Sequence, residues 1–261
     1  MNFLDNKENK LIKNFLKQGY LIRKVENKKS LIYINNLIKK ASCKILNIPK
    51  INFNKVHEIV KKENLNEFRL SIIKLMSNDK YLRYHYFNLA KKKLYNLVNN
   101  ELMMQKNINL SIQFPNDETS LLPIHSDVWS GDSAYEINLW LPLVNCYKTK
   151  SIYILKNNKL KSFSKKLKNL SFKSSDQIFK LAKTEINWLK VEHGKFLLFN
   201  QAIPHGNVIN RENETRWSLN CRFKSIFSPY DDKKIGEFFL PITVRAMTEI
   251  GVNYKNPFKE K

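Results

Sequence analysis

The sequence predicts an α+β fold in which an N-terminal helical annex precedes a double-stranded β-helix, the two-sheet barrel also called a jelly roll. Two observations predict this fold. Apolar residues recur at spacings of three and four over about the first 100 residues, and at a spacing of two from residue 107 onward. The 6 glycines and 8 prolines are scattered along the 261 residues, so we expect one domain without a linker.

Helices make up most of the predicted annex, which covers residues 1–104. Their apolar positions are Leu11, Ile12, Phe15 and Leu16, then Leu31, Ile34, Leu37 and Ile38, then Leu70, Ile73 and Leu75. A short extended piece beginning at Gly19 is expected to separate the first two helices. A further helix is expected over residues 82–102.

Three later segments alternate between polar and apolar residues, as strands with two different faces do. The polar positions are Asn107, Asn109, Ser111 and Gln113, then Glu136, Asn138 and Trp140, then Arg216, Ser218, Asn220 and Arg222. Ordinary half-buried strands would turn such a face to water. These positions are poor in Lys, however, in a chain that otherwise uses Lys freely, so we favour the interior of a barrel that recognises a ligand.

The predicted jelly-roll core spans residues 105–228, and residues 229–261 form a C-terminal extension. Residues 145–190 are expected to be an insertion within the core, of the kind that serves as a lid or recognition loop. Its stretch from 159 to 173 is dense in Lys and is expected to form one face of a loop or helix.

The formal net charge of +23 suggests a nucleic-acid partner. Nearly all of this charge is Lys, however, and Lys accompanies many Asn and Ile, a bias typical of an AT-rich genome. We therefore regard nucleic acid as a minor alternative and expect a small-molecule or carrier-linked substrate, with an anionic group as one option.

Composition also bears on the compartment. Neither a signal-like apolar run at the N-terminus nor a stretch of about 20 apolar residues occurs, so we expect a cytoplasmic protein without a membrane span. Cys43, Cys146 and Cys221 are odd in number and widely spaced, which predicts reduced core residues rather than disulfides or a zinc site. The sequence does not predict an oligomeric state.

The strongest chemical signal is a set of three metal-ligand residues. His125 and Asp127 lie two residues apart, so on extended backbone both side chains point to the same side. His205 follows an apolar strand pattern 80 residues later. Two imidazoles and one carboxylate on one face are the ligands of a mononuclear Fe(II) that keeps open positions for a cosubstrate and O2. His193 is a weaker rival for the distal ligand, because it lies at a turn before the strand.

A second element completes a cosubstrate site. 2-Oxoglutarate binds iron through one end, and its far carboxylate needs a fixed cation with a planar donor fork. Arg216 lies eleven residues after His205 and shares a strand face with Ser218. Arg222, further along the same face, is the second candidate.

Other residues are candidates for the same cavity. If the strand phases are right, Gln113 and Asn138 contact the cosubstrate and Trp140 and Arg222 contact the substrate. Trp129 and Asp132 follow the metal pair directly and are further substrate candidates, although a plain turn at Gly131 would explain them equally well. The two other histidines, His57 and His85, fall in the helical region, where we expect core or solvated side chains.

The order HSD, then HGN, then Arg-x-Ser resembles the phytanoyl-CoA dioxygenase-like branch of the Fe(II)/2-oxoglutarate oxygenases. The stretches IQFPND, HSDVWSGDSAYEINLWLPL, GKFLLFNQAIPHGN and RWSLNCRF are most similar to the bacterial sporadic carbohydrate cluster oxygenases. The resemblance covers residues 105–225 well. It implies a cupin-like core and decarboxylation of 2-oxoglutarate to succinate and CO2, coupled to hydroxylation of a sugar precursor in surface-polysaccharide or secondary metabolism.

Two other functions compete with this one. A nucleic-acid demethylase of the same superfamily is favoured by the positive charge and by RENETR, a partial match to the arginine-rich tail of that branch. A metal-free binding barrel, with a vestigial triad, is the second. The substrate, the oxidised position and the outcome of the oxidation are not predicted by the sequence.

Overall fold

A computed structural model describes residues 3–169 and 174–258. Its main antiparallel sheet has the order β1-β7-β4-β9-β2-β10, and β3 also pairs with β9. The strands are β1 (Tyr20–Lys24), β7 (Lys195–Asn200), β4 (Ile137–Pro142), β9 (Arg216–Ser225), β2 (Leu102–Gln105), β10 (Phe239–Thr243) and β3 (Asn109–Gln113). Because β9 has ten residues, one edge of it pairs with β3 in its first half and with β2 in its second.

A second, smaller sheet has the order β6-β5-β8. It consists of β6 (Ile186–Trp188), β5 (Tyr153–Leu155) and β8 (His205–Gly206), and both pairings are antiparallel. An isolated antiparallel bridge between His125 and His205 attaches a further chain segment to it. The predicted combination of helices with antiparallel sheets is therefore confirmed.

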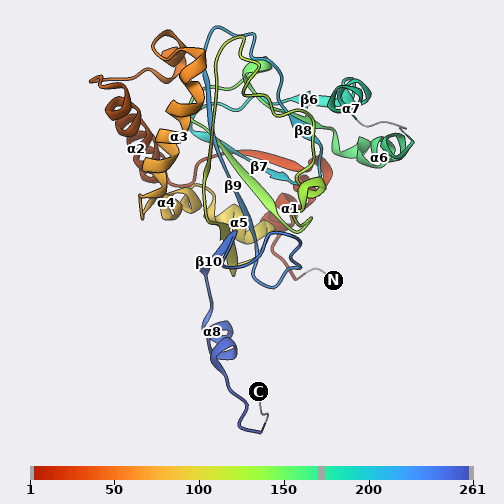
Figure 1. Cartoon of the computed structure of the whole chain (residues 1–261). Helices are drawn as coiled ribbons and strands as arrows, with labels where there is room; N and C mark the ends of the chain where they lie inside the picture. Colours follow the sequence, from red (N-terminus) through yellow and green to blue (C-terminus); the bar gives the residue numbers. More distant parts are fainter. Residues whose placement is uncertain (1–2, 170–173, 259–261) are drawn as a thin grey trace.

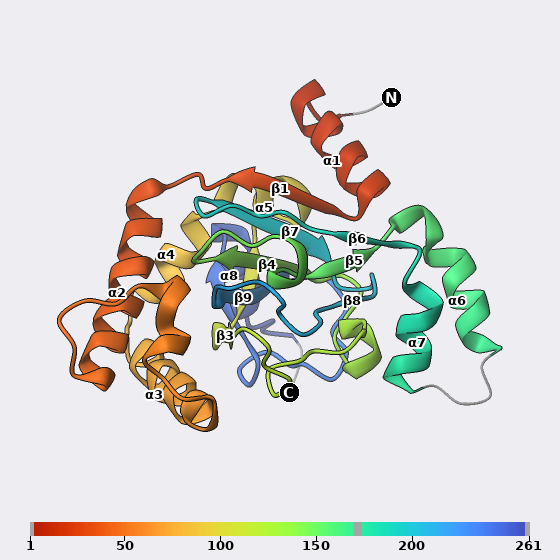
Figure 2. The same cartoon turned by 90° about the horizontal axis from the view of Figure 1, so that it is seen from above.

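Helices lie on both sides of the strands. They are α1 (Asn6–Gln18), α2 (Lys28–Leu46), α3 (Leu65–Ser77), α4 (Leu82–Asn88), α5 (Lys91–Leu97), α6 (Leu160–Lys168), α7 (Ser175–Ala182) and α8 (Ala246–Asn253). Figure 1 shows α2, α3 and α4 beside the main sheet, and Figure 2 shows α6 and α7 at the opposite side of the molecule. Figure 1 shows α8 extending away from the rest of the molecule. No described helix is both long and apolar enough to cross a membrane.

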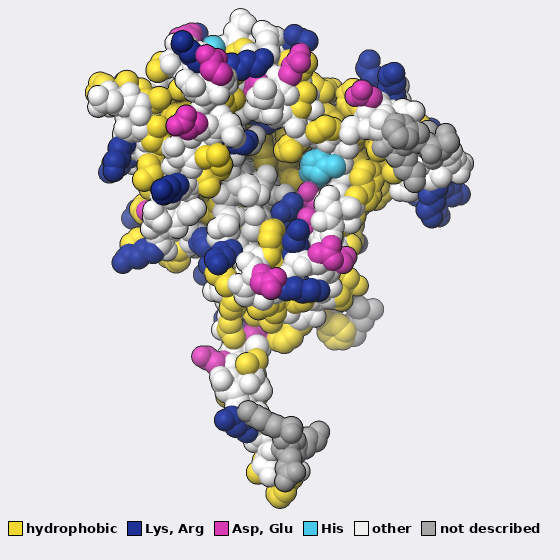
Figure 3. All heavy atoms as spheres, viewed as in Figure 1, with side chains coloured by type: hydrophobic (Ala, Val, Ile, Leu, Met, Phe, Trp, Pro, Cys, Tyr) yellow, Lys and Arg dark blue, Asp and Glu magenta, His cyan; other side chains and the backbone are white. Residues whose placement is uncertain are grey.

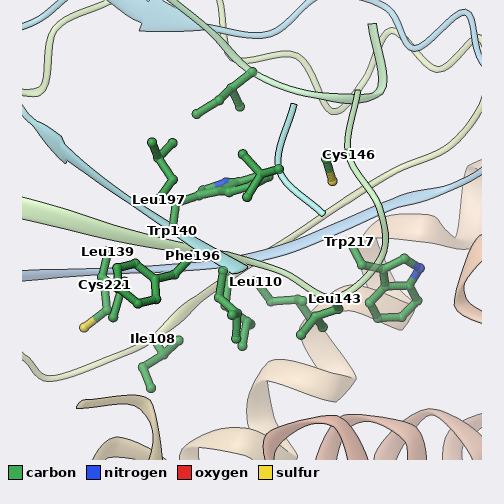
Figure 4. Close-up of a cluster of buried hydrophobic side chains, with 14 of the residues drawn as sticks. Ile108, Leu110, Leu139, Trp140, Leu143, Cys146, Phe196, Leu197, Trp217 and Cys221 are labelled. Atoms are coloured by element: carbon green, nitrogen blue, oxygen red, sulfur yellow. The ribbon is translucent and has the colours of Figure 1, made fainter. Parts of the chain in front are cut away.

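The core lies between the main sheet and the helices. The apolar face of β9 presents Trp217, Leu219, Cys221 and Phe223, all fully buried. Trp217 stacks on Phe53 with ring centroids 4.5 Å apart, and its indole N–H donates to the Phe53 carbonyl. Figure 4 shows Leu139 and Trp140, successive residues of β4, on opposite sides of the sheet, as strand geometry requires. The three cysteines are free, and Cys146 and Cys221 are buried.

The predicted helix over 82–102 is wrong. The chain forms two short helices, α4 and α5, and Ala90 between them has non-helical backbone angles (φ −142°, ψ 18°). Leu89 and Ala90 are completely buried, so tertiary packing decides the break, and β2 begins at Leu102. The extended piece after Gly19 is a strand, β1, that pairs with β7 along its whole length.

The region 145–190 is more than an inserted loop, because β5 and β6 within it are two of the three strands of the second sheet. Three-residue strands are too short to show a period of two. The additional helices α6 and α7, which pack on each other, lie between these strands. Lys173, the last residue of the Lys-rich stretch, lies outside the described residues.

Candidate metal centre

His125, Asp127 and His205 lie together between the two sheets. Their ligand atoms all lie within 4.8 Å of one another. The bridge between the histidines is closed by two hydrogen bonds, from His125 N to His205 O (2.9 Å) and from His205 N to His125 O (2.8 Å). Asp127 begins the short 3-10 helix η3 (Asp127–Ser130), and its N–H donates to the Gln201 carbonyl. Two segments 80 residues apart thus hold the triad.

The donor atoms suit a cation. The Nδ1 atoms of His125 and His205 contact the carbonyls of Pro123 (2.7 Å) and Ile203 (2.9 Å), so the tautomer with a proton on Nδ1 leaves each Nε2 lone pair free. The Nε2 atoms lie 3.6 and 4.0 Å from the Asp127 carboxylate oxygens. Asp127 Oδ2 is buried and accepts no hydrogen bond from the described residues. A metal ion bound to this oxygen would take the place of the missing hydrogen-bond donor.

Electrostatics prepare Asp127 and His205 for a metal, whereas in the metal-free protein the hydrogen bonds of His125 to Asp127 and to the Pro123 carbonyl outweigh its burial and raise its pKa. Burial alone would raise the pKa of Asp127, but the His125 hydrogen bond and the charges of His205 and Arg222 outweigh it and hold that pKa well below its usual range. Burial lowers the pKa of His205 to about 4, so its imidazole is neutral at pH 7. An ionised carboxylate and a neutral imidazole are the protonation states that metal binding needs.

The triad opens into a cavity of about 200 Å³. Its lining contains the predicted polar strand positions Asn109, Ser111, Asn138, Trp140, Arg216, Ser218, Asn220 and Arg222, and also Leu122, Ile152, Phe199, Gly206 and Asn207. The predicted phase of all three strands is therefore the observed one. Figure 3 shows a histidine side chain at the surface beside a hollow where acidic and basic side chains gather.

Arg216 is a buried cation with unused donors. Its residue is 1% exposed, and its Nη2 donates to the Ser111 hydroxyl at 3.0 Å. Its Nε and Nη1 are buried and have no acceptor in the described part of the chain. Burial lowers the pKa of Arg216 to about 10, which still leaves the guanidinium charged at neutral pH. Two unpaired donor nitrogens of a buried guanidinium fit the carboxylate of a ligand.

Arg222 lies on the predicted face of β9 and lines the cavity, but its donors already have partners. Its Nη2 lies 3.1 Å from Asp127 Oδ1 and 3.5 Å from Asp132 Oδ2, and its Nε donates to the Gln201 side chain at 2.7 Å. These contacts hold one oxygen of Asp127 and leave the other, Oδ2, for a metal. Arg222 thus binds the side chains next to the triad, whereas Arg216 has donors without acceptors among the described residues.

The remaining candidates separate into two groups. Asn138 and Trp140 line the cavity, and Asn138 Oδ1 is buried without a partner among the described residues. Gln113 does not line it: the side chain donates to the Val208 carbonyl and accepts from Asn207, bracing the loop after His205. Trp129 is 47% exposed and lies outside the lining, and Asp132 is buried against Arg222.

The other histidines lie apart from the triad. His57 contacts the Thr215 hydroxyl, and His85 stacks on Tyr33 with centroids 3.9 Å apart. His193 contacts Asn35 on the surface of α2, so the preference for His205 over His193 agrees with the observed cluster.

Sequence reasoning missed Gln201. Its side chain accepts from Arg222 and donates to Glu136 at 2.7 Å, and its backbone carbonyl accepts from Asp127 N and the Ser126 hydroxyl. Burial raises the pKa of Glu136, which lies at the end of this chain of hydrogen bonds, to about 7. A lone Gln after a strand carries no spacing signal that would have identified it.

Comparisons with known proteins find similar folds among solved structures only. No protein-family model matches the chain, and the curated proteins give no significant match. Solved structures do match. The non-heme monooxygenase ThoJ, in a nickel complex, has a TM-score of 0.53 and 11% identity, over 91% of this chain and 85% of that chain.

Two further structures match at similar identity. EctD from S. alaskensis, with 2-oxoglutarate and 5-hydroxyectoine, has a TM-score of 0.57 and 11% identity, over 87% of this chain and 78% of its own. The non-heme alpha-ketoglutarate-dependent carbocyclase SnoK from nogalamycin biosynthesis has a TM-score of 0.53 and 12% identity, over 92% of this chain and 97% of its own. The chain therefore has the overall fold that ThoJ, EctD and SnoK share.

Proposed function

We propose that this protein is a non-heme Fe(II)- and 2-oxoglutarate-dependent oxygenase whose two sheets form a double-stranded β-helix. One observation carries the proposal: a buried guanidinium with two unpaired donor nitrogens, Arg216, faces the same cavity as a His-Asp-His triad with an unused buried carboxylate oxygen. A metal-free binding barrel does not account for both groups at once, because an anionic ligand at Arg216 would still leave Asp127 Oδ2 buried without a partner among the described residues.

The roles of the side chains follow from this arrangement. His125, Asp127 and His205 hold the iron, which when bound supplies the activation of O2 for oxidising a C–H bond. Arg216 binds the far carboxylate of 2-oxoglutarate, and the Ser218 hydroxyl lies on the same strand face to bond it as well. Asn138 offers an unpaired amide oxygen to the cosubstrate or substrate. The buried walls exclude water from this end of the cavity.

We further propose a small, hydroxyl-rich substrate, such as a free or carrier-linked sugar precursor, and hydroxylation as the outcome. The amides of Asn109, Asn207 and Asn220 and the Trp140 ring line the cavity, a lining that suits neutral hydroxyl groups. The 5-hydroxyectoine in EctD is likewise a small molecule. The sequence resemblance to the phytanoyl-CoA dioxygenase-like branch, and within it to the carbohydrate cluster oxygenases, supports the same substrate class.

The decisive experiment is anaerobic reconstitution with Fe(II) followed by titration with 2-oxoglutarate. We expect a visible metal-to-ligand charge-transfer band and, after admission of O2, succinate formed without added substrate. Asp127→Ala should lose iron binding itself. Arg216→Met should keep iron and lose the band at cosubstrate concentrations that saturate the wild type.

His193→Ala is the matched control, because it removes a histidine outside the triad and should leave the band unchanged. The absence of a band in wild-type protein that has bound one iron would refute the proposal. Formaldehyde released from a methylated oligonucleotide, with no activity on small molecules, would move the function to the demethylase alternative.

A further inference from the structure

A large cavity lies outside the metal centre. It has a volume of about 1090 Å³ and adjoins a second cavity of about 380 Å³, with which it shares Asn145 and His193. We call the two together the Trp188 groove. It is formed by the segment after β4, the segment between β6 and β7, and α2 with the residues that follow it. None of its lining residues belongs to the lining of the metal cavity.

Backbone and side-chain hydrogen bonds join the segments that form the groove. Cys146 and Val191 exchange both backbone hydrogen bonds at 2.9 Å, which joins the two long segments side by side, as Figure 2 shows for the chain after β4 and the chain before β7. His193 N donates to the Asn145 side chain, and the His193 ring contacts Asn35 at 3.0 Å. The walls are therefore held in place by hydrogen bonds of their own.

The charge of the groove is one-sided. Four lysines line it, Lys39, Lys50, Lys148 and Lys190, against a single acid, Glu192. Glu192 is already paired with Lys195 at 2.8 Å and lies 3.7 Å from Lys190. Lys39, Lys50 and Lys148 form no ion pair within residues 3–169 and 174–258. Lys148 also has a left-handed backbone (φ 45°), a conformation that costs energy for a residue other than Gly.

An aromatic surface accompanies the cations. Trp188 lines the groove and is 41% exposed, and its ring is fixed by an edge contact with Tyr153, with centroids 5.3 Å apart. Tyr147 lines the same cavity. Asn35 Oδ1, in the adjoining cavity, is buried and lacks a hydrogen-bond donor in the described chain. Among the described residues, a held indole beside the unpaired Lys148, with Lys190 paired only to the shared Glu192 and the unpaired Lys39 and Lys50 in the adjoining cavity, matches a ligand with a flat ring and a multiply charged anion.

We infer that the Trp188 groove is a second binding site, and that it takes a nucleoside diphosphate, free or as part of a larger molecule. The base stacks on Trp188 and the diphosphate lies among Lys148, Lys190 and the lysines of the adjoining cavity. The volume exceeds what such a ligand needs, since sites for molecules of this size measure roughly 300–1,000 Å³. The inference stands independently of the proposed oxygenase function, because it uses other residues.

The test is calorimetric titration of the full-length protein with UDP and ADP, and with inorganic diphosphate and uridine as partial ligands. We expect saturable one-to-one binding of a nucleoside diphosphate. Lys148→Ala/Lys190→Ala should weaken it by about tenfold or more. Trp188→Leu should weaken it by about fivefold or more while leaving the affinity for diphosphate unchanged. Trp188→Phe, which keeps an aromatic ring, should reduce the affinity for the nucleoside diphosphate less than Trp188→Leu does.

The matched control is Lys161→Ala/Lys165→Ala, an equal charge change on exposed positions of α6. An equal loss in this control would reduce the effect to general charge and overturn the site. So would diphosphate binding as tightly as UDP, an absence of saturable binding at millimolar ligand, or much tighter binding of a single-stranded oligonucleotide at the same lysines. Anaerobic binding of Fe(II) and 2-oxoglutarate, measured on every variant, should be unchanged and reports on the oxygenase site separately.

Discussion

At the scale of single residues, the protein keeps two buried charges that the described chain leaves incompletely paired. Arg216 has two nitrogens without acceptors, and Asp127 has one carboxylate oxygen without a donor. Burying a charge costs several kcal/mol unless partners replace the lost water. Residues of this kind lower the stability of the free protein and are expected where a ligand completes the pairing.

Arg216→Met should therefore separate stability from binding. Removing the buried charge is expected to raise the free energy of unfolding of the metal-free protein by about 1–3 kcal/mol, as in other replacements of buried ions by apolar groups. It should weaken 2-oxoglutarate binding by about a hundredfold or more. Urea unfolding and cosubstrate titration measure the two effects, and a loss of stability would contradict the argument.

Arg222→Gln tests the contact with the metal ligand. Without the 3.1 Å contact to Asp127 Oδ1, the carboxylate is free to rotate and lacks its neighbouring charge. We expect metal affinity to fall by about 10- to 100-fold, the usual effect of losing an outer-shell partner. Equilibrium titration with Co(II) measures it. The affinity should be much less affected in Asp132→Asn, which changes only the longer, 3.5 Å contact.

Glu136 predicts a pH dependence of stability. Burial raises its pKa in the folded protein to about 7, from 4.5 in an ordinary environment. The folded state thus binds more protons than the unfolded state between these values, so this group's contribution to stability is fully present below pH 4.5 and is lost as pH rises through 7.

Glu136→Gln removes this titration. The free energy of unfolding of the variant, relative to wild type, should therefore increase from about pH 5 to about pH 8. The difference between the two pH values is the quantity to compare, because the amide also changes the hydrogen bond to Gln201. A variant that follows the wild type in parallel across this range would exclude a raised pKa at Glu136.

At the scale of elements, β9 joins the site to the core. Its alternate residues line the metal cavity on one face and pack on the helices on the other. Trp217 is the largest side chain on the buried face, and it contacts Phe53 by stacking and Phe68 by an edge. Arg216 and Ser218 on either side of it are held in position by this packing.

Trp217→Ala should cost about 3–5 kcal/mol of stability, because it leaves a large cavity and an unpaired carbonyl at Phe53. Trp217→Phe keeps a ring and should cost clearly less. Urea unfolding followed by circular dichroism measures both. A similar cost for the two variants would mean that the hydrogen bond, rather than the packed volume, is the main contribution of this residue.

At the scale of the whole molecule, the main sheet collects strands from distant parts of the chain. β1 lies near the N-terminus, β10 lies after residue 238, and both pair into the same sheet as β4 and β9. We propose on this basis that these strands and the helices packed on them unfold as one unit. The segment beyond β10 is the exception, since α8 has no buried residue.

Deletion of residues 246–261 should therefore change the free energy of unfolding by less than about 1 kcal/mol. Deletion of residues 238–261 should cost several times more, because it removes the fully buried Phe239 and the pairing of β10 with β2. Thermal unfolding of the two truncated proteins checks the contrast. Strong destabilisation by the shorter deletion would show that α8 has a packing partner.

The sequence by itself determined the class of fold, the faces of three strands and the residue types of the metal set. It could do so because a strand of five or more residues shows a period of two, and because few combinations of side chains suit an oxygenase iron. The HSD motif, a distal histidine and Arg-x-Ser therefore predict residues that the structure brings to one cavity, and their binding of iron and 2-oxoglutarate is our proposal.

Only the tertiary structure decided which partners those residues contact. Arg216 and Arg222 have the same residue type on the same strand face, and their roles differ because one meets Ser111 and open space while the other meets Asp127 and Gln201. The three-residue strands β5 and β6 and the break at Ala90 likewise depend on partners far away in the chain. Local periodicity contains no information about such partners, since they are chosen by packing and pairing across the whole molecule.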